Sequence, residues 1–261
     1  MKRICLLALA GLASTQALAI GRLADVTITD RDSGETLGVH AYRGEYWVEG
    51  RPGARYAITI RNQQGARLLA VTSVDGVNVV TGETAKLDQR GYVFDAWAAY
   101  DIAGWRKSDA QTAAFEFTSV PKSYAARTGR PDNVGVIGVA LFRERIAVPV
   151  VSQRLDLPPV ESTADVRSKA SAESRAERSA LAAGAVAPAP GLGTGHGERE
   201  SSYVTHVGFE REQAQPNELI RIRYDSHANL LALGVIRELP TPRRRPQPFQ
   251  DEPRLGYVPD P

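Results

Sequence analysis

The sequence predicts a mainly β protein: an antiparallel β-sandwich with a disordered or partly helical insert and a disordered C-terminal tail. Three observations lead to this prediction. Short apolar runs separated by turn residues recur through residues 35–148, and no long amphipathic helix pattern interrupts them. A later segment is nearly empty of large apolar residues, and the C-terminal segment is rich in proline. The predicted regions are a signal peptide at 1–19, the main part of the sandwich at 20–154, a low-complexity insert at 155–195, completing strands at 196–239 and a tail at 240–261.

The first nineteen residues have the pattern of an export signal. Lys2 and Arg3 supply a positive start, Ile4–Ala13 is an apolar run, and Ala17–Ala19 offers a small-x-small cleavage pattern. The run is shorter than the roughly 20 apolar residues that a membrane-spanning helix needs. We therefore expect cleavage after Ala19 and a periplasmic or secreted protein.

The composition that remains after cleavage excludes several classes of protein. Cys5 is the only cysteine and lies in the leader, so the 242 remaining residues hold no disulfide, thiolate metal site or cysteine nucleophile. Without Lys2 and Arg3, 30 basic residues face 30 acidic ones, which gives no support to a nucleic-acid partner. No second apolar segment reaches bilayer length, so we expect no transmembrane segment.

The first region has the patterns of short strands. Tyr56–Ile60 alternates apolar side chains with polar or small ones, as in a half-buried strand. Asp75-Gly76 separates the apolar runs Leu68–Val74 and Val77–Val80, and both turn residues tolerate the positive φ of a type I′ hairpin. Further strands are predicted at Leu37–Tyr42, Gly91–Phe94, Tyr100–Trp105 and Ala113–Thr118.

The most apolar run after the leader is Val134–Phe142, which we interpret as a central strand. The alternative is an α+β domain with a short helix at Pro121–Thr128. We expect at most one or two helical turns within the sandwich.

The chain changes character in the predicted insert. Ser162–Ala183 is rich in Ala, Ser, Glu and Arg, and Ala185–Gly197 is rich in Ala, Pro and Gly. Such segments bury too little apolar surface to offset the entropy of ordering them. A solvated helix within 163–184 stays open, since Ala, Glu and Arg favour one.

Strand patterns return at Tyr203–Phe209, Leu219–Tyr224 and Leu230–Ile236. Three strands alone make a thin core, so we expect them to complete the first sheets; a separate small domain is the alternative. Residues 240–261 hold seven prolines and the cluster Arg243–Arg245, which predicts an extended tail that either solubilises the chain or docks it to a partner.

The tryptophans are the first candidates for a ligand site. Trp47, Trp97 and Trp105 could stack on sugar rings, although a large aromatic side chain is more often buried. Trp105 precedes Arg106 and Lys107, a pattern that suits a cation–π contact or an anionic ligand, or simply a strand that runs into a turn.

The second candidate is the glycine-rich segment with His196 and Glu198, which we interpret as a flexible loop. Its spacing matches no zinc signature, because such a site needs three or four converging ligands. It also lacks the Lys-Ser or Lys-Thr of a phosphate-binding loop. We therefore predict ligand binding at Trp105, Arg106, His196 and Glu198, with no metal and no cofactor.

Seven short segments carry a resemblance to known sequences. They are Val48–Tyr56, Val74–Val79, Ile102–Arg106, Ser123–Ala126, Asn133–Gly138, Leu192–Arg199 and Ile222–Ser226. Together they resemble a family of uncharacterised secreted proteobacterial proteins, over roughly 46–144 and 191–236. The resemblance implies export, one folded unit that includes the His196 segment, and no particular activity.

The predicted function is non-enzymatic: binding of an envelope or extracellular ligand, or a structural role at the cell envelope. The chain contains neither Gly-x-Ser-x-Gly nor His-Glu-x-x-His. The alternative is a secreted hydrolase with a site at loop ends near His196 and Glu198, with Asp101 as a further candidate. The sequence gives no oligomeric state.

Overall fold

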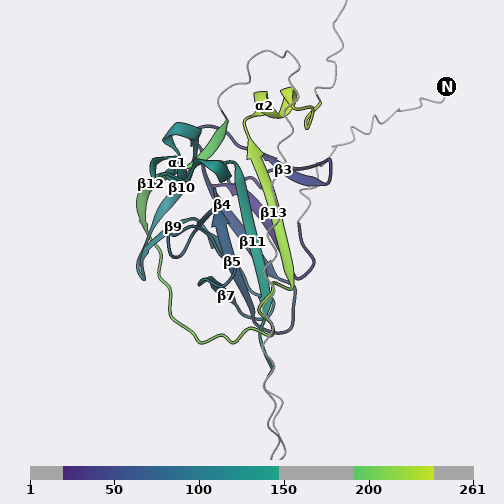
Figure 1. Ribbon diagram of the computed structural model, residues 1–261, viewed down its shortest axis with the longest axis vertical. Coiled ribbons are helices and arrows are strands. Elements are labelled where there is room, and N and C mark those ends of the chain that lie inside the picture. The colour runs from purple at the N-terminus through teal and green to yellow at the C-terminus, as the bar shows by residue number, and fades with distance from the viewer. Residues whose placement is uncertain (1–19, 147–190, 238–261) are drawn as a thin grey trace, which may run out of the picture.

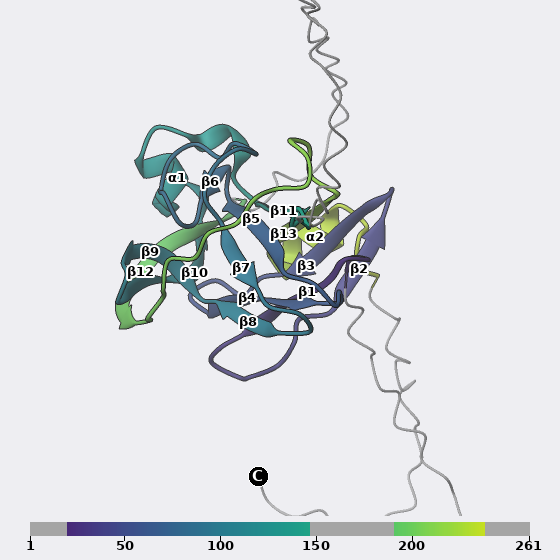
Figure 2. The same cartoon turned by 90° about the horizontal axis from the view of Figure 1, so that it is seen from below.

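Alternating apolar side chains build two β-sheets that pack face to face in the computed structural model, which describes residues 20–146 and 191–237. Figure 2 shows the two layers from below. This arrangement confirms the predicted sandwich. The leader, most of the insert and the tail lie outside the described residues.

The first sheet, sheet A, has six strands in the described chain. Its strands are β1 (Ala24–Asp30), β4 (Arg55–Asn62), β8 (Ala99–Ile102), β9 (Gly104–Ser108), β10 (Gln111–Ser119) and β12 (Leu192–Ser201). The order is β1-β4-β10-β12, and β8 and β9 pair with β4 and β10 respectively. All pairings in this sheet are antiparallel.

Sheet B has seven described strands. They are β2 (Val39–Tyr42), β3 (Glu45–Glu49), β5 (Leu68–Val74), β6 (Val77–Asn78), β7 (Tyr92–Phe94), β11 (Val136–Arg143) and β13 (Glu218–Asp225). The order is β2-β3-β13-β11-β5-β6, and β7 pairs with β5. The β3–β13 pair is parallel, so the sheet is mixed.

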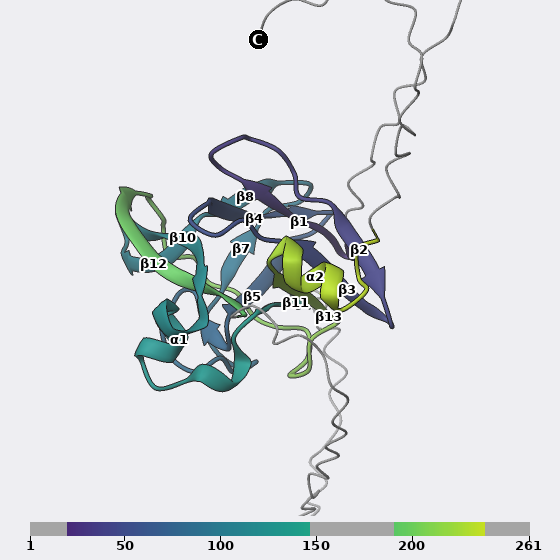
Figure 3. The ribbon, with the colours of Figure 1, turned by 90° about the horizontal axis from the view of Figure 1, so that it is seen from above.

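In residues 20–146 and 191–237, the α-helices are the short α1 and α2, which both lie at the upper end of the molecule in Figure 1; Figure 3 shows them from above. The elements are η1 (Val120–Lys122), α1 (Tyr124–Arg127), η2 (Pro131–Asn133) and α2 (His227–Ala232). The side chains of Ser123 and Ser226 cap α1 and α2 by accepting hydrogen bonds from backbone N–H groups.

The predicted hairpin forms between β5 and β6. Asp75 has φ 52° and Gly76 has φ 73°, so both central residues occupy the left-handed region that a type I′ turn requires. Val74 pairs with Val77, directly across the turn.

The central strand predicted at Val134–Phe142 forms β11, which lies between β5 and β13. Ile137 and Leu141 point into the core from this strand, while Ile58 and Ile60 point into it from β4. Because β11 has a neighbour on each side and covers the core, its run of apolar residues is what the position demands.

Residues 191–225 complete both sheets. β12 pairs with β10 at the edge of sheet A, and β13 lies between β11 and β3 in sheet B. The second half of the chain therefore shares the interior of the first half and does not form a separate unit.

A buried hydrogen-bond network joins the two sheets. The Tyr56 hydroxyl on β4 contacts Thr194 Oγ1 on β12 at 2.6 Å, and Thr194 Oγ1 contacts the Tyr224 hydroxyl on β13 at 2.7 Å. Tyr224 then donates to the Asp75 carboxylate, which also accepts hydrogen bonds from the backbone N–H groups of Thr194 and Gly135 at 2.8 and 2.9 Å. All three groups around Asp75 are donors.

Because Asp75 accepts every one of these bonds, the donor and the acceptor of each hydrogen bond in the network are determined. Because Tyr224 uses its one proton on Asp75, Thr194 must donate to Tyr224, and Tyr56 must donate to Thr194. Burial raises the pKa of Asp75, and its hydrogen bonds offset this in part. Burial also raises the pKa of Tyr56 and Tyr224 well above the usual value, so both tyrosines stay protonated.

Four details differ from the sequence predictions. Ala24–Asp30 forms β1, although no strand was predicted there, and β12 begins at Leu192, inside the range assigned to the insert. Tyr203–Phe209 forms no strand: backbone hydrogen bonds from Ser202 to Ala110 and from Val204 to Asp109 hold the start of a connecting segment there. Leu230–Ile236 is not a strand either: Ser226 starts helix α2, which ends at Ala232.

None of the helices within the described ranges is long and apolar enough to cross a membrane.

Replacing the Tyr224 hydroxyl tests the bridging network. Tyr224→Phe leaves Asp75 and Thr194 each without one buried partner, so we expect the free energy of unfolding to fall by about 1–3 kcal/mol. Urea denaturation measures this change. Tyr203→Phe removes a hydroxyl from an exposed side chain and serves as the matched control; an equal loss in both variants would contradict the role of the network.

The raised pKa of Asp75 predicts a pH dependence. A carboxyl group with a higher pKa in the folded than in the unfolded chain stabilises the fold most below its unfolded value of 3.8, and this stability is lost as pH rises through the folded pKa. We expect the stability difference between wild type and Asp75→Asn to shrink as pH rises from 4 to 7. Urea unfolding at several pH values measures it, and a growing difference would show that the pKa is lowered instead.

Candidate functional site

A cleft of about 1000 Å³ lies beside β7, β8 and β9 and is bounded by residues 202–211. Figure 2 shows this segment leaving β12 and crossing β7 and β5 on its way to sheet B. A concave site of this size is large enough for a small organic ligand or several sugar rings.

Arg106 fixes one wall of the cleft. Its Nε donates to the Tyr92 hydroxyl at 3.1 Å, and its guanidinium group donates to the Ser202 carbonyl and hydroxyl at 2.6 and 3.1 Å. The guanidinium also lies 5.6 Å from the centre of the Tyr92 ring. Arg106 therefore joins β9, β7 and the 202–211 segment.

Arg211 fixes the other end of this segment. Its guanidinium donates to the backbone carbonyls of Leu87 and Gln89 at 2.6 and 2.7 Å, and lies 4.2 Å from the ring centre of Phe142. Burial lowers the pKa of Arg211, which stays a cation because its normal value is so high. With both ends held, the segment forms a fixed wall of the cleft.

Two tyrosines present large surfaces to solvent in the cleft. Tyr100 is 50% exposed and Tyr203 is 82% exposed. Tyr100 packs against the buried Phe94 ring at 5.4 Å, which supports it from below. An exposed aromatic ring that a buried ring supports is a suitable surface for stacking a flat apolar ligand face.

The charges around the cleft are balanced. Four arginines face four aspartates: Arg67, Arg90, Arg106, Arg211, Asp88, Asp95, Asp101 and Asp109. His206 Nε2 lies 3.0 Å from Asp109 Oδ1, and both side chains are exposed to water. The cleft therefore has no net electrostatic preference for a polyanion or a polycation.

The four predicted ligand residues, Trp105, Arg106, His196 and Glu198, do not form one site. Arg106 lines the cleft, as described above. Trp105 is buried at 2% exposure, donates from its indole N–H to the Gly195 carbonyl at 3.3 Å, and packs 4.9 Å from the Tyr124 ring. The ring of His196 lies at the surface, and its centre is 5.9 Å from the centre of the same Tyr124 ring.

The prediction of a flexible loop at His196 is wrong, since this segment belongs to β12. Its glycines serve close packing: a Cβ atom at Gly197 would lie 2.9 Å from the Ala114 carbonyl oxygen of the neighbouring strand. His196 is therefore held on strand β12 of sheet A and does not lie on a flexible loop.

Glu198 and Asp101 do not join His196 in one cleft. Asp101 lines the cleft and accepts a hydrogen bond from Thr59 at 2.7 Å, whereas neither His196 nor Glu198 lines it. The charge of Glu198 instead helps to raise the pKa of Arg55. The arrangement expected for the hydrolase alternative is therefore not assembled by these three residues.

The other tryptophans also differ in exposure. Trp47 is half-buried on β3, with the Arg223 guanidinium 5.6 Å from its ring. Trp97 is 63% exposed on the turn between β7 and β8, and has a φ of 62°, which is uncommon for a bulky residue. Trp97 lies between Asp95 and Tyr100 in the sequence; these two residues line the cleft, whereas Trp97 does not.

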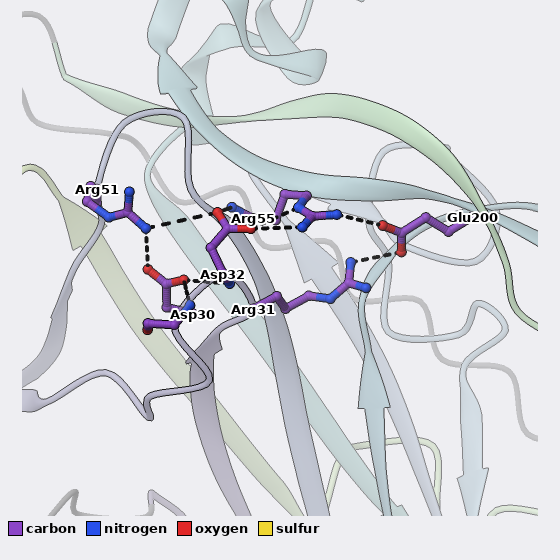
Figure 4. Close-up of polar contacts among 7 residues, drawn as sticks. Asp30, Arg31, Asp32, Arg51, Arg55 and Glu200 are labelled. Atoms are coloured by element: carbon purple, nitrogen blue, oxygen red, sulfur yellow. Dashed lines mark hydrogen bonds and ion pairs between the residues drawn. The ribbon is translucent and has the colours of Figure 1, made fainter.

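A surface network of ion pairs crosses one end of sheet A (Figure 4). Arg55 pairs with Asp32 at 2.9 Å and with Glu200 at 3.4 Å, and Arg31 pairs with Glu200 at 2.8 Å. Arg51 continues the network to Asp30 at 3.0 Å.

This network is charge-balanced, with three arginines and three carboxylates. Burial alone would raise the pKa of Asp30, but hydrogen bonds from Arg51 and from backbone N–H groups lower it overall. Backbone and side-chain hydrogen bonds from Arg55 lower the pKa of Asp32. The network ties β12 to the ends of β1 and β4, a structural role.

Metal ligands are not grouped in the part of the chain that the structure describes: no three His, Cys, Asp or Glu side chains there are placed to hold an ion.

Comparison with family models, curated proteins and solved structures finds no match to this chain. The resemblance to secreted proteobacterial proteins stays a prediction, and the function is argued from the site alone.

Sequence reasoning missed three residues of interest. Tyr100 and Tyr203 are exposed in the cleft, and Tyr124 lies between Trp105 and His196. For Tyr203, a signal existed in Ser201-Ser202-Tyr203, where polar neighbours argue against a buried strand. For Tyr124 and Tyr100, exposure depends on which strands lie beside them.

Removing the Arg106 side chain tests how the cleft wall is held. Arg106→Ala deletes the hydrogen bonds to Ser202 and Tyr92, so we expect amide hydrogen exchange in residues 202–206 to rise at least several-fold. Hydrogen exchange with mass spectrometry measures this. Arg90→Ala, at another arginine of the cleft, is the control and should leave exchange unchanged; equal effects would show that Arg106 is not the tie.

Proposed function

We propose that this chain is a non-catalytic binding protein of the cell envelope, and that its cleft binds an uncharged, hydroxyl-rich ligand such as an oligosaccharide. The observation that carries the proposal is the pair of exposed rings, Tyr100 and Tyr203, in a charge-balanced cleft. The location at the envelope rests on the export pattern of residues 1–19.

The chemistry of the cleft suits a sugar. The C–H face of a pyranose ring is flat and apolar and stacks on an aromatic ring, while its hydroxyl groups need donors and acceptors at the edge. Asp88, Asp95 and Asp101 supply acceptors, and Arg90 supplies donors. Arg106 and Arg211 donate to backbone carbonyls and so shape the wall, and the aspartates that line the cleft balance their positive charge.

Rigid walls favour binding. Since residues 202–211 are tied at both ends, a ligand does not have to order them, and more of the contact energy remains for affinity.

A secreted hydrolase is the alternative function, and it has less support. His196 is separated from the cleft that contains Asp101. The His206–Asp109 pair does lie at the cleft, but both side chains are exposed, whereas a catalytic dyad is normally positioned by burial. Sustained turnover on a panel of ester, glycoside and peptide substrates that is lost in His196→Ala would establish the hydrolase and exclude our proposal.

Removing the exposed rings tests the proposal. We expect Tyr100→Ala and Tyr203→Ala each to weaken binding of a captured oligosaccharide by about 5- to 100-fold, equal to about 1–3 kcal/mol of lost stacking and burial. A glycan array on the wild-type protein selects the ligand, and isothermal titration calorimetry measures each variant.

Tyr46→Ala is the matched control, because Tyr46 is also exposed but lies outside this cleft, on β3. Binding that Tyr46→Ala weakens and that the two cleft variants leave intact would move the site elsewhere. A wild-type protein that binds no glycan on the array would overturn the sugar assignment.

A further inference from the structure

A second feature lies outside the cleft, around the half-buried ring of Tyr124 on α1. We define the cationic cluster as Lys107, Arg130, His196 and Arg199 together with Tyr124. Lys107 Nζ lies 5.6 Å from the centre of the Tyr124 ring, the Arg130 guanidinium carbon lies 6.0 Å from it, and the ring of His196 lies 5.9 Å away. Three segments, β9, the segment after α1 and β12, thus bring positive groups to the ring that α1 carries.

The ring itself is firmly placed. Tyr124 packs against Trp105 at 4.9 Å, and Trp105 packs edge-on against Phe115 at 5.2 Å in the core. The cluster is therefore built on the hydrophobic core, which fixes its geometry.

The charged groups that act on Lys107 and His196 are other cations of the cluster. Partial burial of the exposed Lys107 side chain lowers its pKa, and the charge of Arg199 lowers it further. Burial also lowers the pKa of His196, and the charges of Lys107 and Arg199 add to this. Each charged group that acts on these two side chains is itself positive, so the groups repel one another.

The carboxylates of the same strand are engaged elsewhere. Glu200 pairs with Arg31 and Arg55, and the charge of Glu198 acts on Arg55. Arg130 donates to the Gly82 carbonyl and the Thr128 hydroxyl, which are neutral acceptors. Within residues 20–146 and 191–237, no carboxylate forms an ion pair with Lys107, Arg130 or Arg199.

We propose that the cationic cluster binds a tetrahedral oxyanion, a phosphate or sulfate group. Lys107 offers a point charge and Arg199 offers a planar fork. Arg130, whose Nε and Nη2 already donate to Thr128, adds its positive charge. His196 becomes a further donor once protonated. The π-face of Tyr124 compensates only part of this charge, because a cation–π contact at an exposed site is weak. An anion relieves the repulsion among the cations, whereas a neutral ligand does not. This site is independent of the cleft and of the sugar proposal.

Histidine NMR tests the site directly with inorganic phosphate as the probe. An anion held beside His196 favours the charged imidazole, so saturating phosphate should raise the pKa of His196 by about 1. The chain holds four histidines, and His206, which pairs with Asp109 outside the cluster, is the internal control and should not move. Sodium chloride keeps the ionic strength constant, and the spectrum of His196→Gln assigns the signal.

Two lysine variants separate a specific site from general charge. Lys107→Gln should abolish the response of His196 to phosphate, whereas Lys86→Gln, at an exposed lysine outside the cluster, should preserve it. Both lysines are exposed, so both variants should keep the wild-type spectrum elsewhere. Equal shifts in all four histidines, or an unchanged response in Lys107→Gln, would mean an adventitious ion only and would overturn the proposal.

Vesicles distinguish the source of the anion. Sedimentation with phosphatidylglycerol vesicles that is lost in Lys107→Gln assigns the site to a lipid headgroup; a response to free phosphate without sedimentation assigns it to a soluble phosphate. Absence of both responses refutes the site, and neither result depends on whether the cleft binds a glycan.

Discussion

The buried carboxylate of Asp75 is the interaction on which the rest of this structure depends. It lies in the turn of the β5–β6 hairpin and accepts hydrogen bonds from Tyr224, Thr194 and Gly135, which belong to distant parts of the chain. A buried carboxylate that lacks its donors is costly, so the sheets can pack only if β12 and β13 are both in register. One polar residue thus selects the pairing of strands that apolar packing alone would leave less defined.

The same register places the functional features. Thr194 and Gly195 lie next to His196 on β12, so the strand that reaches Asp75 in the core also carries the histidine to the surface beside Tyr124. Beyond Ser201 the chain leaves the sheet and is tied down by Arg106, and this tie forms the wall of the cleft. Core register and cleft shape are therefore coupled along one strand and its continuation.

β12 also contributes to two surface groups of different charge. Glu200 belongs to the balanced network with Arg31 and Arg55, while His196 and Arg199 belong to the group of cations around Tyr124. An overall charge near zero hides this difference, because local excess of one sign is cancelled elsewhere. Net charge thus describes the whole chain and not its binding surfaces.

The sequence by itself determined the β-sandwich class, the Asp75-Gly76 hairpin, the central strand at Val134–Phe142 and the strand at Leu219–Tyr224, because period-2 alternation and turn chemistry are local. It misassigned Leu230–Ile236, whose apolar run fits a strand or a helix until the Ser226 cap decides, and it took the glycines around His196 for a loop. Only the tertiary structure decided which aromatic rings are exposed and that Trp105 and His196 both lie against the Tyr124 ring. The physical reason is that burial and side-chain contact depend on strands far apart in the chain, whose pairing no local pattern specifies.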